Sequence, residues 1–341
     1  VLAAMTARIK LLGRMDVVEK RRPQDGRIKT RAGDGHEIEL RLSTLPTAFG
    51  EKLVMRVFDP DVLQRDFDQL GLKGQDLARW REMTSRPNGI VLVTGPTGSG
   101  KTTTLYATLR ALATEEVNVS TIEDPIEMVE NSFNQMQVQP AIDLGFADGI
   151  RALMRQDPDI IMVGEIRDLE TAEMAVQAAL TGHLVISTLH TNDAPSAITR
   201  LLDLGVPAYL LQSTLIGVMA QRLTRTLCPA CRQPDDSVTD EQWAAFVKPF
   251  KNVPKPVQIW RPVGCVACRM TGFRGRAGLY EILANGEAIR SFITERPELR
   301  RLRLAAIKHG MRPLRIAGSA AVAEGITTIE EVLRHAPPVE V

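Results

Sequence analysis

The stretch Gly95-Pro96-Thr97-Gly98-Ser99-Gly100-Lys101-Thr102 has two glycines five positions apart, followed by Lys and Thr. This is the pattern of a phosphate-binding loop. The run Ile90–Val93 before it is short, apolar and β-branched, which predicts a buried parallel strand. The run Thr102–Ala113 after it contains good helix formers and neither Gly nor Pro. Strand, glycine-rich turn and helix start follow one another as a working loop of this kind requires.

The residue types of this loop suit contact with phosphate. Glycines let backbone N–H groups close around phosphate oxygens, and the start of the helix adds its dipole. We expect Lys101 to reach the β- and γ-phosphates of a nucleotide and the Thr102 hydroxyl to hold Mg²⁺. The predicted nucleotide contacts are Gly95, Pro96, Thr97, Gly98, Ser99, Gly100, Lys101, Thr102 and Thr103. The alternative is a glycine-rich turn without a ligand.

Length and composition are those of an ordinary globular protein. The chain has 341 residues, which suggests about two domains and an accessory piece. Its net charge of +1 gives no field that would favour nucleic acid or membrane. No apolar run approaches the ~18 residues of a membrane helix. Four cysteines and no visible signal peptide indicate a cytosolic protein. Because Val1 lies at the edge of an expected helix, Leu2–Met15, we expect an upstream region.

The first 59 residues predict a small α+β domain. Arg27–Arg31 and Glu37–Leu42 alternate between apolar and polar residues, and Gly33-Asp34-Gly35 between them predicts a hairpin turn. Glu51–Phe58 predicts a third strand. A linker follows at residues 60–74, and a helix over Gln75–Ser85 leads into the next region.

Residues 75–225 alternate predicted strands and helices, which is typical of an α/β fold with a parallel sheet. The further strands are Val117–Ile122, Ile160–Val163 and Leu184–Leu189, with a helix over Leu169–Leu180. Ligands in such sheets bind at the carboxyl ends of the strands. Polar residues follow each strand there, namely Glu123-Asp124, Gly164-Glu165 and His190-Thr191-Asn192. We therefore expect one site at this edge of the sheet.

Acidic residues after two strands are candidates for catalysis. Most P-loop proteins place an Asp for Mg²⁺ at the position held here by Gly164. Glu165 would then serve the metal through water or activate the nucleophile; the alternative is a surface acid. A hydrolase also needs a carboxylate to deprotonate water, and Glu123, Asp124 and Glu127 are all candidates. That second segment could instead be a solvated loop.

Histidines and arginines near these segments leave two readings open. His183 and His190 flank the strand Leu184–Leu189, either as site residues or as core or capping histidines. The arginines could be surface charge or could reach the nucleotide site of a neighbouring subunit. They are Arg21, Arg22, Arg27, Arg31, Arg41 and Arg56 in the first domain, and Arg151, Arg155 and Arg167 in the core.

The four cysteines form two C-x₂-C pairs, Cys228/Cys231 and Cys265/Cys268, with 33 residues between the pairs. Four thiolates predict a tetrahedral structural Zn²⁺ site, because they leave no open position for catalysis. A redox dithiol and free structural cysteines are the alternatives. A helical C-terminus is expected from Ala288 to His335.

Several longer motifs resemble those of the secretion ATPases that drive type II secretion and type IV pilus assembly. Thr121–Glu127 resembles the Asp box of that family, Ile160–Asp168 its atypical Walker B motif, and Thr181–Asn192 its His box. Arg22–Arg27 and Phe49–Glu51 resemble turns of its second N-terminal domain. The resemblance covers nearly the whole chain. The paired cysteines fit the assembly and secretion branch, since the retraction ATPases generally lack them.

The resemblance implies an α/β fold with a RecA-like P-loop ATPase core, a small α+β N-terminal domain and a tetracysteine zinc subdomain. The expected divisions are residues 1–59, truncated at their start, a linker at 60–74, the core at 75–225, the zinc subdomain at 226–285 and a C-terminal helical region at 286–341. The implied ligands are ATP, Mg²⁺ and Zn²⁺.

The resemblance also implies a role for each matching residue. Glu127 matches the general base and Glu165 the Walker B glutamate. His183 and His190 match histidines that contact the nucleotide site and link it to domain position. Arg41 and Arg56 match arginines that approach the γ-phosphate. The remaining matches are arginines near the site or a subunit boundary, Arg151, Arg155 and Arg167.

The implied function is that of a homo-hexameric ATPase motor, cytoplasmic and peripheral at the inner membrane when full length. Its partner would be an inner-membrane platform protein, with the docking domain expected upstream of this chain. No nucleic acid and no direct membrane insertion are expected. A nucleic-acid-dependent RecA-like motor is an alternative. The balanced charge and the 4% content of aromatic residues argue against it, because single-stranded nucleic acid is bound by basic, aromatic-rich grooves. An ATP-gated scaffold without turnover is another, against which stand Glu127 and Glu165. The sequence does not distinguish type II secretion from type IV pilus assembly.

Overall fold

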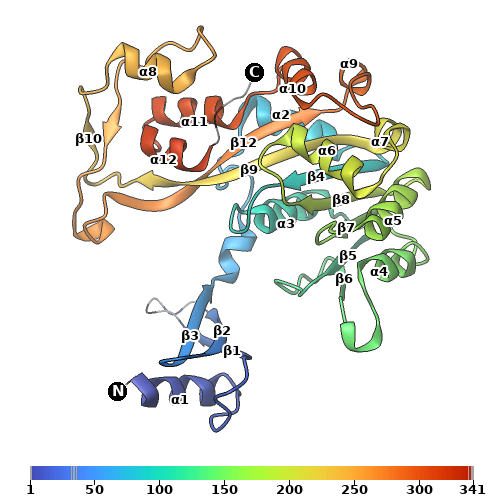
Figure 1. Ribbon diagram of the computed structural model, residues 1–341, viewed down its shortest axis with the longest axis vertical. Helices are drawn as coiled ribbons and strands as arrows, with labels where there is room; N and C mark the ends of the chain where they lie inside the picture. Colours follow the sequence, from blue (N-terminus) through green and yellow to red (C-terminus); the bar gives the residue numbers. More distant parts are fainter. Residues whose placement is uncertain (1, 32, 34, 36, 337, 339–341) are drawn as a thin grey trace. The chain divides into compact units, whose positions relative to one another are not determined.

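The computed structural model describes residues 2–31, 33, 35, 37–336 and 338 (Figure 1). The chain divides into two compact units, residues 1–65 and residues 66–341. Each unit has its own sheet, and the two are described separately.

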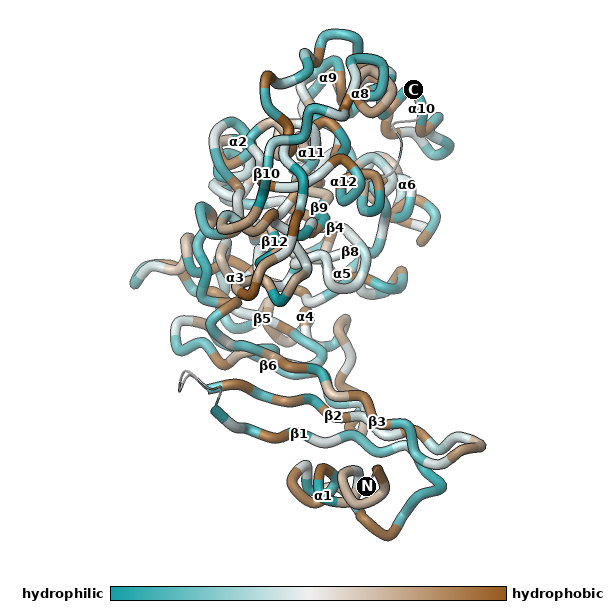
Figure 2. The backbone as a smooth tube through the Cα atoms, turned by 90° about the vertical axis from the view of Figure 1, so that its left-hand side faces the viewer, coloured by the Kyte–Doolittle hydropathy of each residue, from teal (hydrophilic) through white to brown (hydrophobic). Residues whose placement is uncertain are grey.

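The first unit is one helix and a three-stranded antiparallel sheet. The helix is α1 (Leu2–Leu12), and the strands β1 (Gln24–Arg31), β2 (Glu37–Thr47) and β3 (Gly50–Phe58) lie in the order β1-β2-β3. A short 3₁₀ helix, η1 (Pro60–Gln64), follows. The alternation of polar and apolar residues along β2 is visible as changing colour in Figure 2. All three predicted strands run longer than expected, and Asp34 of the predicted hairpin turn lies outside the described residues.

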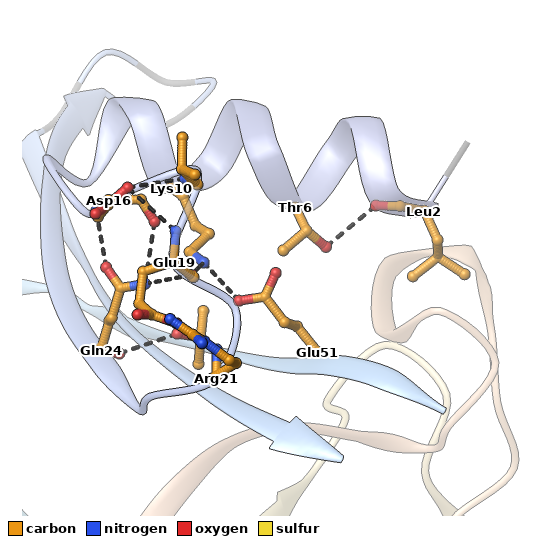
Figure 3. Close-up of polar contacts among 10 residues, drawn as sticks. Leu2, Thr6, Lys10, Asp16, Glu19, Arg21, Gln24 and Glu51 are labelled. Atoms are coloured by element: carbon orange, nitrogen blue, oxygen red, sulfur yellow. Dashed lines mark hydrogen bonds and ion pairs between the residues drawn. The ribbon is translucent and has the colours of Figure 1, made fainter. Parts of the chain in front are cut away.

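A buried lysine fastens α1 to the rest of this unit (Figure 3). The Lys10 side chain is fully buried, and its Nζ donates to the Glu19 backbone carbonyl at 2.7 Å and to Glu51 Oε1 at 2.5 Å. A buried ammonium is costly unless it is paired and hydrogen-bonded, and both conditions are met here. The helix ends at Leu12, earlier than the predicted Met15, and the chain then turns through Gly13 and Arg14, with the Gly13 N–H bonded to the Ile9 carbonyl at 2.8 Å.

The second unit is built on a seven-stranded sheet with the order β12-β9-β4-β8-β7-β5-β6. The strands are β4 (Gly89–Thr94), β5 (Val119–Glu123), β6 (Asn134–Gln137), β7 (Ile160–Val163), β8 (Leu184–Leu189), β9 (Leu215–Leu227) and β12 (Phe273–Ala284). All neighbours pair in parallel except β12, which runs antiparallel to β9. This confirms the predicted α/β fold with a parallel sheet.

Helices cover both faces of this sheet, as its continuous apolar strands require. In β4, Val91 and Val93 face a core shared with α2 (Gly74–Thr84) and α3 (Lys101–Leu112), whereas Ile90 and Leu92 face the opposite core. The helices on that opposite side include α4 (Phe146–Leu153), α5 (Leu169–Leu180), α6 (Ala194–Leu204), α7 (Ala208–Thr214), α11 (Leu314–Ala323) and α12 (Ile329–His335). The phosphate-binding loop thus leaves the middle of a sheet that is buried on both sides.

Strands β9 and β12 form a long ribbon that the sequence patterns did not reveal. Their register runs from Leu227 opposite Phe273 to Gly217 opposite Ala284. The segment between them carries the cysteines and the elements β10 (Gln233–Pro234), α8 (Asp240–Val247), β11 (Trp260–Arg261) and η3 (Val266–Cys268). The predicted range 226–285 for the zinc subdomain therefore includes a strand of the central sheet.

The C-terminal part is broken into short helices. They are α9 (Glu287–Arg290), α10 (Leu299–Lys308), α11 and α12. Gly310 and Gly325 adopt positive φ angles of 91° and 69° after α10 and α11, and Pro313 precedes α11, so a single long helix is excluded. Among the described residues, no helix combines the length and the apolar character needed to cross a membrane.

Candidate functional site

The phosphate-binding loop connects β4, whose six residues are all buried, to the start of α3. Gly95 lies so close to β9 that an added Cβ would be 2.6 Å from the Gln221 backbone carbonyl oxygen. Gly100 has a φ of 91°, and a Cβ there would be 2.8 Å from the Gln221 amide nitrogen. Larger side chains would be strained at both positions, so the sheet itself dictates the glycines of the motif.

The start of α3 is suited to an anion. Gly100 is its N-cap and offers no side-chain acceptor, so the first N–H groups of the helix have no side-chain cap. Lys101 folds back over the loop, and its Nζ donates to the carbonyl oxygens of Gly95 at 2.8 Å and Pro96 at 3.2 Å. The Ser99 hydroxyl is buried and has no hydrogen-bond partner within the described part of the chain. These donors fit a group rich in acceptor oxygens, such as a polyphosphate.

The electrostatics of Lys101 also fit a nucleotide. Burial lowers the pKa of its ammonium from 10.5 to about 8; the Glu165 carboxylate opposes this shift and the Arg222 guanidinium adds to it. A phosphate bound beside Lys101 would restore the favourable charge environment that burial removes. The free protein therefore holds a cation whose protonation is coupled to anion binding.

Glu165 lies where the sequence predicts it, directly after β7 at the edge that carries the loop. Its carboxylate pairs with Arg167, and its Oε2 lies 3.4 Å from Nε2 of His190, which follows β8. Burial lowers the pKa of His190, with the nearby Lys101 acting in the same direction and Glu165 opposing it. The neighbouring strands β4, β8 and β7 thus bring Lys101, His190 and Glu165 together.

The acidic segment after β5 separates into two kinds of carboxylate. Glu123 is buried; its Oε2 accepts from the Tyr106 hydroxyl at 2.8 Å, and its Oε1 accepts from Thr121 at 2.7 Å and from the Gln135 amide at 3.1 Å. Donors thus occupy both oxygens of Glu123, which argues for a structural role and against a base. Glu127 is only partly buried, and β5 lies next to β7 in the sheet.

Other predicted residues lie away from this cluster. His183 precedes β8, where its Nδ1 contacts the Ala178 carbonyl at 2.9 Å; it is at the amino end of the strand whose carboxyl end leads to His190. Arg151 pairs with Asp148 at 2.6 Å on the exposed side of α4, and Arg155 donates to the Arg151 carbonyl. The structure does not bring these three residues to the loop of their own chain.

In the first unit, Arg41 and Arg56 are direct cross-strand partners on β2 and β3. Arg41 is partly buried, with its guanidinium 4.7 Å from the centre of the Phe58 ring and its Nε 3.5 Å from Glu39, whereas Arg56 is exposed. Like charges placed directly opposite each other are destabilising. Glu39 offsets the charge of Arg41, whereas Arg56 leaves a positive charge exposed on this small sheet.

The four cysteines come together as the sequence predicts. Their sulfur atoms all lie within 4.8 Å of one another, with separations of 3.9 Å for Cys228–Cys265 and 3.8 Å for Cys231–Cys268 and Cys265–Cys268. A tetrahedron with Zn–S bonds of ~2.3 Å requires sulfur separations of about 3.8 Å. The distances fit a metal and are far too long for disulfides.

Backbone N–H groups support the sulfurs. Gly264 donates to the Cys231 sulfur at 3.3 Å, and Cys265 and Gly272 donate to the Cys268 sulfur at 3.1 and 3.2 Å. Burial raises the pKa of the Cys268 thiol, but the N–H groups of Cys265 and Gly272 and the neighbouring thiols outweigh it and lower the pKa, whereas at Cys231 burial outweighs the Gly264 donor and raises the pKa. Such donors favour thiolate, which is the form that binds metal.

Two supporting residues on β9 were not predicted. Gln221 accepts from the Thr104 hydroxyl of α3 at 2.8 Å, and the Arg222 guanidinium donates to the Asn192 carbonyl at 2.7 Å. Both are buried. The available signal was a Gln-Arg pair directly after the apolar run Gly217–Ala220, since polar residues on a central strand need buried partners.

Curated proteins similar to this chain include components of two related machineries. Over 336 residues the chain is 61% identical to the type IV pilus assembly ATPase TfpB of Acinetobacter baylyi, covering 98% of this chain and 57% of that protein. Over 330 residues it is 46% identical to the type II secretion system ATPase E of Vibrio cholerae, covering 97% and 64%. The chain therefore spans less than two thirds of the length of these relatives.

Solved structures agree with the fold. The pilus retraction motor PilT with bound ADP is 29% identical, with a TM-score of 0.65 over 93% of this chain and 78% of that one. The Legionella pneumophila ATPase DotB has the same TM-score at 23% identity over 91% of this chain and 76% of that one, which supports the fold alone. The family described as "Type II/IV secretion system protein" matches residues 1–334, and the chain belongs to this family.

Proposed function

We propose that the chain is the motor part of a hexameric ATPase that powers type II protein secretion or type IV pilus assembly. One observation carries the proposal: the phosphate-binding loop, Glu165 and His190 meet at the carboxyl ends of neighbouring strands β4, β7 and β8. The similarity to ATPases of both machineries supports the same conclusion.

In the proposed reaction, backbone N–H groups of residues 97–101 and the Lys101 ammonium bind the β- and γ-phosphates of ATP. Thr102 and Glu165 are the residues that would hold Mg²⁺ beside these phosphates. Bound Mg²⁺ offsets negative charge on the phosphates and orients them. Glu127 accepts the proton of the attacking water, because Glu123 is already occupied by three donors.

The Glu165–His190 contact makes the charge environment of His190 depend on whether nucleotide and Mg²⁺ are bound. His190 lies 3.4 Å from the carboxylate that serves Mg²⁺, so a change at Glu165 alters the charge that His190 experiences. We assign His190 to sensing and not to proton transfer.

The proposed active assembly is a ring of six chains. Arg41 and Arg56, which are cross-strand partners, would supply positive charge to the γ-phosphate in the transition state, as arginines do in many P-loop enzymes. Turnover would then depend on the first unit and on assembly, and nucleotide-driven motion would be passed to a platform protein at the inner membrane.

The metal centre has a structural role in this proposal. Its four sulfurs would hold one Zn²⁺ with no position open for substrate. The ion would fix the segment between β9 and β12.

Phosphate release from Mg·ATP by the purified chain tests the function. We expect turnover that rises with protein concentration as rings form, followed in parallel by light-scattering mass. Lys101→Ala removes a direct phosphate contact and should abolish binding at the concentrations used. Added DNA should change nothing. Absence of turnover at all concentrations with intact ATP binding would favour a scaffold, and stimulation by DNA would favour a nucleic-acid motor.

A further inference from the structure

Each of three consecutive residues after β8 forms a hydrogen bond with a charged side chain that also contacts or belongs to a C-terminal helix. The three residues are Asn192, Asp193 and Ala194, and the helix differs for each. None of these charged partners lies in the nucleotide motifs. The contacts join the loop that carries His190 to α12, α10 and α11 in turn.

The link to α10 is an ion pair. Arg303 Nη2 donates to Asp193 Oδ2 at 2.8 Å, and the two side chains are only 12% and 15% exposed. The other carboxylate oxygen, Oδ1, caps α6 by accepting from the Ser196 N–H at 2.8 Å. Asp193 therefore holds the loop, the start of α6 and α10 in one arrangement.

The link to α11 is the buried carboxylate of Glu281 on β12. Its Oε1 accepts from the Ala194 N–H at 2.8 Å, and its Oε2 accepts from the Leu314 N–H at 3.1 Å. Burial raises the pKa of Glu281 to about 7, although both N–H groups favour the charged form. A buried acid so placed is costly unless the two backbone segments stay where they are.

The link to α12 is Arg222 on β9. It donates to the carbonyl oxygens of Asn192 at 2.7 Å, Gln221 at 3.0 Å and His335 at 3.1 Å. Its Nη1 also lies near the phosphate-binding loop, since a Cβ on Gly95 would be 3.2 Å from it. Arg222 thus touches the loop after β8, the end of α12 and the surroundings of the phosphate site.

On its other side, the same loop contacts the nucleotide edge of the sheet. Thr191 shares hydrogen bonds with Thr94, the last residue of β4, at 2.8 and 2.9 Å. His190 faces Glu165 at 3.4 Å. Residues 190–191 are thus followed, within the next three residues, by three links that are buried or partly buried.

We propose that the segment Asn192–Ala194 couples the nucleotide site to helices α10–α12, and that Arg303, Glu281 and Arg222 are the positioning residues of this coupling. The inference rests on the proposed function, because the segment responds to nucleotide only if the edge of the sheet binds one. Coupling of this kind is carried by a contiguous chain of packed side chains and hydrogen bonds, and the three links form such a chain.

The test compares Arg303→Gln with Arg301→Gln. Arg301 lies on the same helix and makes an exposed ion pair with Glu298 at 2.7 Å, so it is a matched control. We expect Arg303→Gln to lower kcat for Mg·ATP about tenfold or more with less than a threefold change in KM, and Arg301→Gln to match the parent. Arg303→Lys should recover much of the loss. The double variant Asp193→Asn/Arg303→Gln should lose no more than the worse single variant.

Hydrogen exchange with a non-hydrolysable ATP analogue and Mg²⁺ supplies a readout that does not depend on turnover. In the parent and in Arg301→Gln, nucleotide should change the protection of residues 299–308 as well as residues 95–102. In Arg303→Gln only residues 95–102 should respond. A response of residues 299–308 that survives Arg303→Gln, or that is missing in the parent, overturns the coupling. Absence of a response at residues 95–102 in the parent instead overturns the proposed nucleotide site.

Discussion

The phosphate-loop edge and the tetracysteine centre are both built from short motifs, but they are held in place by different forces. The loop leaves the middle of a sheet whose strands are buried on both faces, and its glycines are dictated by contact with β9. The cysteines stand on two turns outside that sheet, where four sulfurs face one another at 3.8 to 3.9 Å. The first site is held by a hydrophobic core, and the second depends on what the sulfurs bind.

The two regions share one strand. β9 contributes Gln221 and Arg222 beside the phosphate-binding loop and ends at Leu227, directly before Cys228. Because β9 is paired with both β4 and β12, we expect the nucleotide edge to stay folded when the metal is lost.

Of the changes considered, metal removal should have the largest effect on the stability of the protein. Apparent binding energies of structural Zn²⁺ in small sites are ~10–16 kcal/mol. We expect one Zn²⁺ per chain by elemental analysis. Chelation or Cys228→Ser should raise amide exchange across residues 228–272 and lower the melting temperature, while affinity for Mg·ATP changes less than threefold. If protein purified without chelator contains no zinc, the predicted zinc site is wrong. If chelation abolishes nucleotide binding, the nucleotide site depends on the metal, which contradicts the expected independence of the two sites.

Arg56→Ala tests whether the nucleotide edge is complete within the second unit. Arginines that stabilise the transferring phosphoryl group contribute ~10³–10⁵ in rate. We expect a sharp fall in turnover with little change in ATP binding. Exposed Arg31, which contacts Glu37 at 3.8 Å in the same sheet, is the control, and Arg31→Ala should leave turnover unchanged. Full activity of Arg56→Ala would rule out a catalytic role for Arg56.

Glu127→Gln separates binding from chemistry at the same edge. A general base contributes ~10²–10⁴-fold, so the variant should bind Mg·ATP like the parent and hydrolyse it that much more slowly. Glu123→Gln is the informative comparison, because it should disturb the buried contacts of Tyr106 and Thr121 and lower stability. Near-normal turnover in Glu127→Gln with loss in Glu165→Gln would move the base to Glu165.

The smallest predicted effect is a pH dependence set by Lys101. Its pKa of about 8 in the free protein lies below that of the phosphate-bound form, so affinity is full below pH 8 and is lost as pH rises through this value. The dissociation constant of ATP should rise about tenfold between about pH 7 and pH 9. Lys101→Arg, which stays charged throughout, should bind with a flat profile. A sloping profile in Lys101→Arg would assign the titration to another group.

Local elements of the second unit were predictable because their residues carry the signal themselves. The bounds of β7, β8 and α5 agree with the predicted runs, since each is uniformly apolar or helix-forming between clear breaks. β9 and β12 were missed because buried polar residues interrupt their apolar pattern, notably Arg222 and Glu281. Arg222 and Glu281 form hydrogen bonds with backbone atoms of residues far away in the sequence, such as His335 and Leu314. A local sequence pattern does not encode such partners.

In the candidate site, too, residues with a local sequence signal were predictable and residues that depend on distant partners were not. Residues 95–102, Glu165, His190 and the cysteines were predictable because each follows a recognisable strand or turn. The structural role of Glu123 was not, since it depends on the Tyr106 hydroxyl of α3 and the Gln135 amide of β6. The sequence pattern therefore locates the chemistry, while packing decides which of several acids is available for it.

Hydrogen exchange of the parent chain with Mg²⁺ and a non-hydrolysable ATP analogue tests the central claim most directly. If the carboxyl ends of β4, β5, β7 and β8 form one nucleotide site, protection should rise together in residues 95–102, 123–127, 164–166 and 190–192. It should remain unchanged at the cysteine turns, residues 228–232 and 264–269. Protection confined to residues 95–102, or spread to the cysteine turns without the other strand ends, would contradict the account.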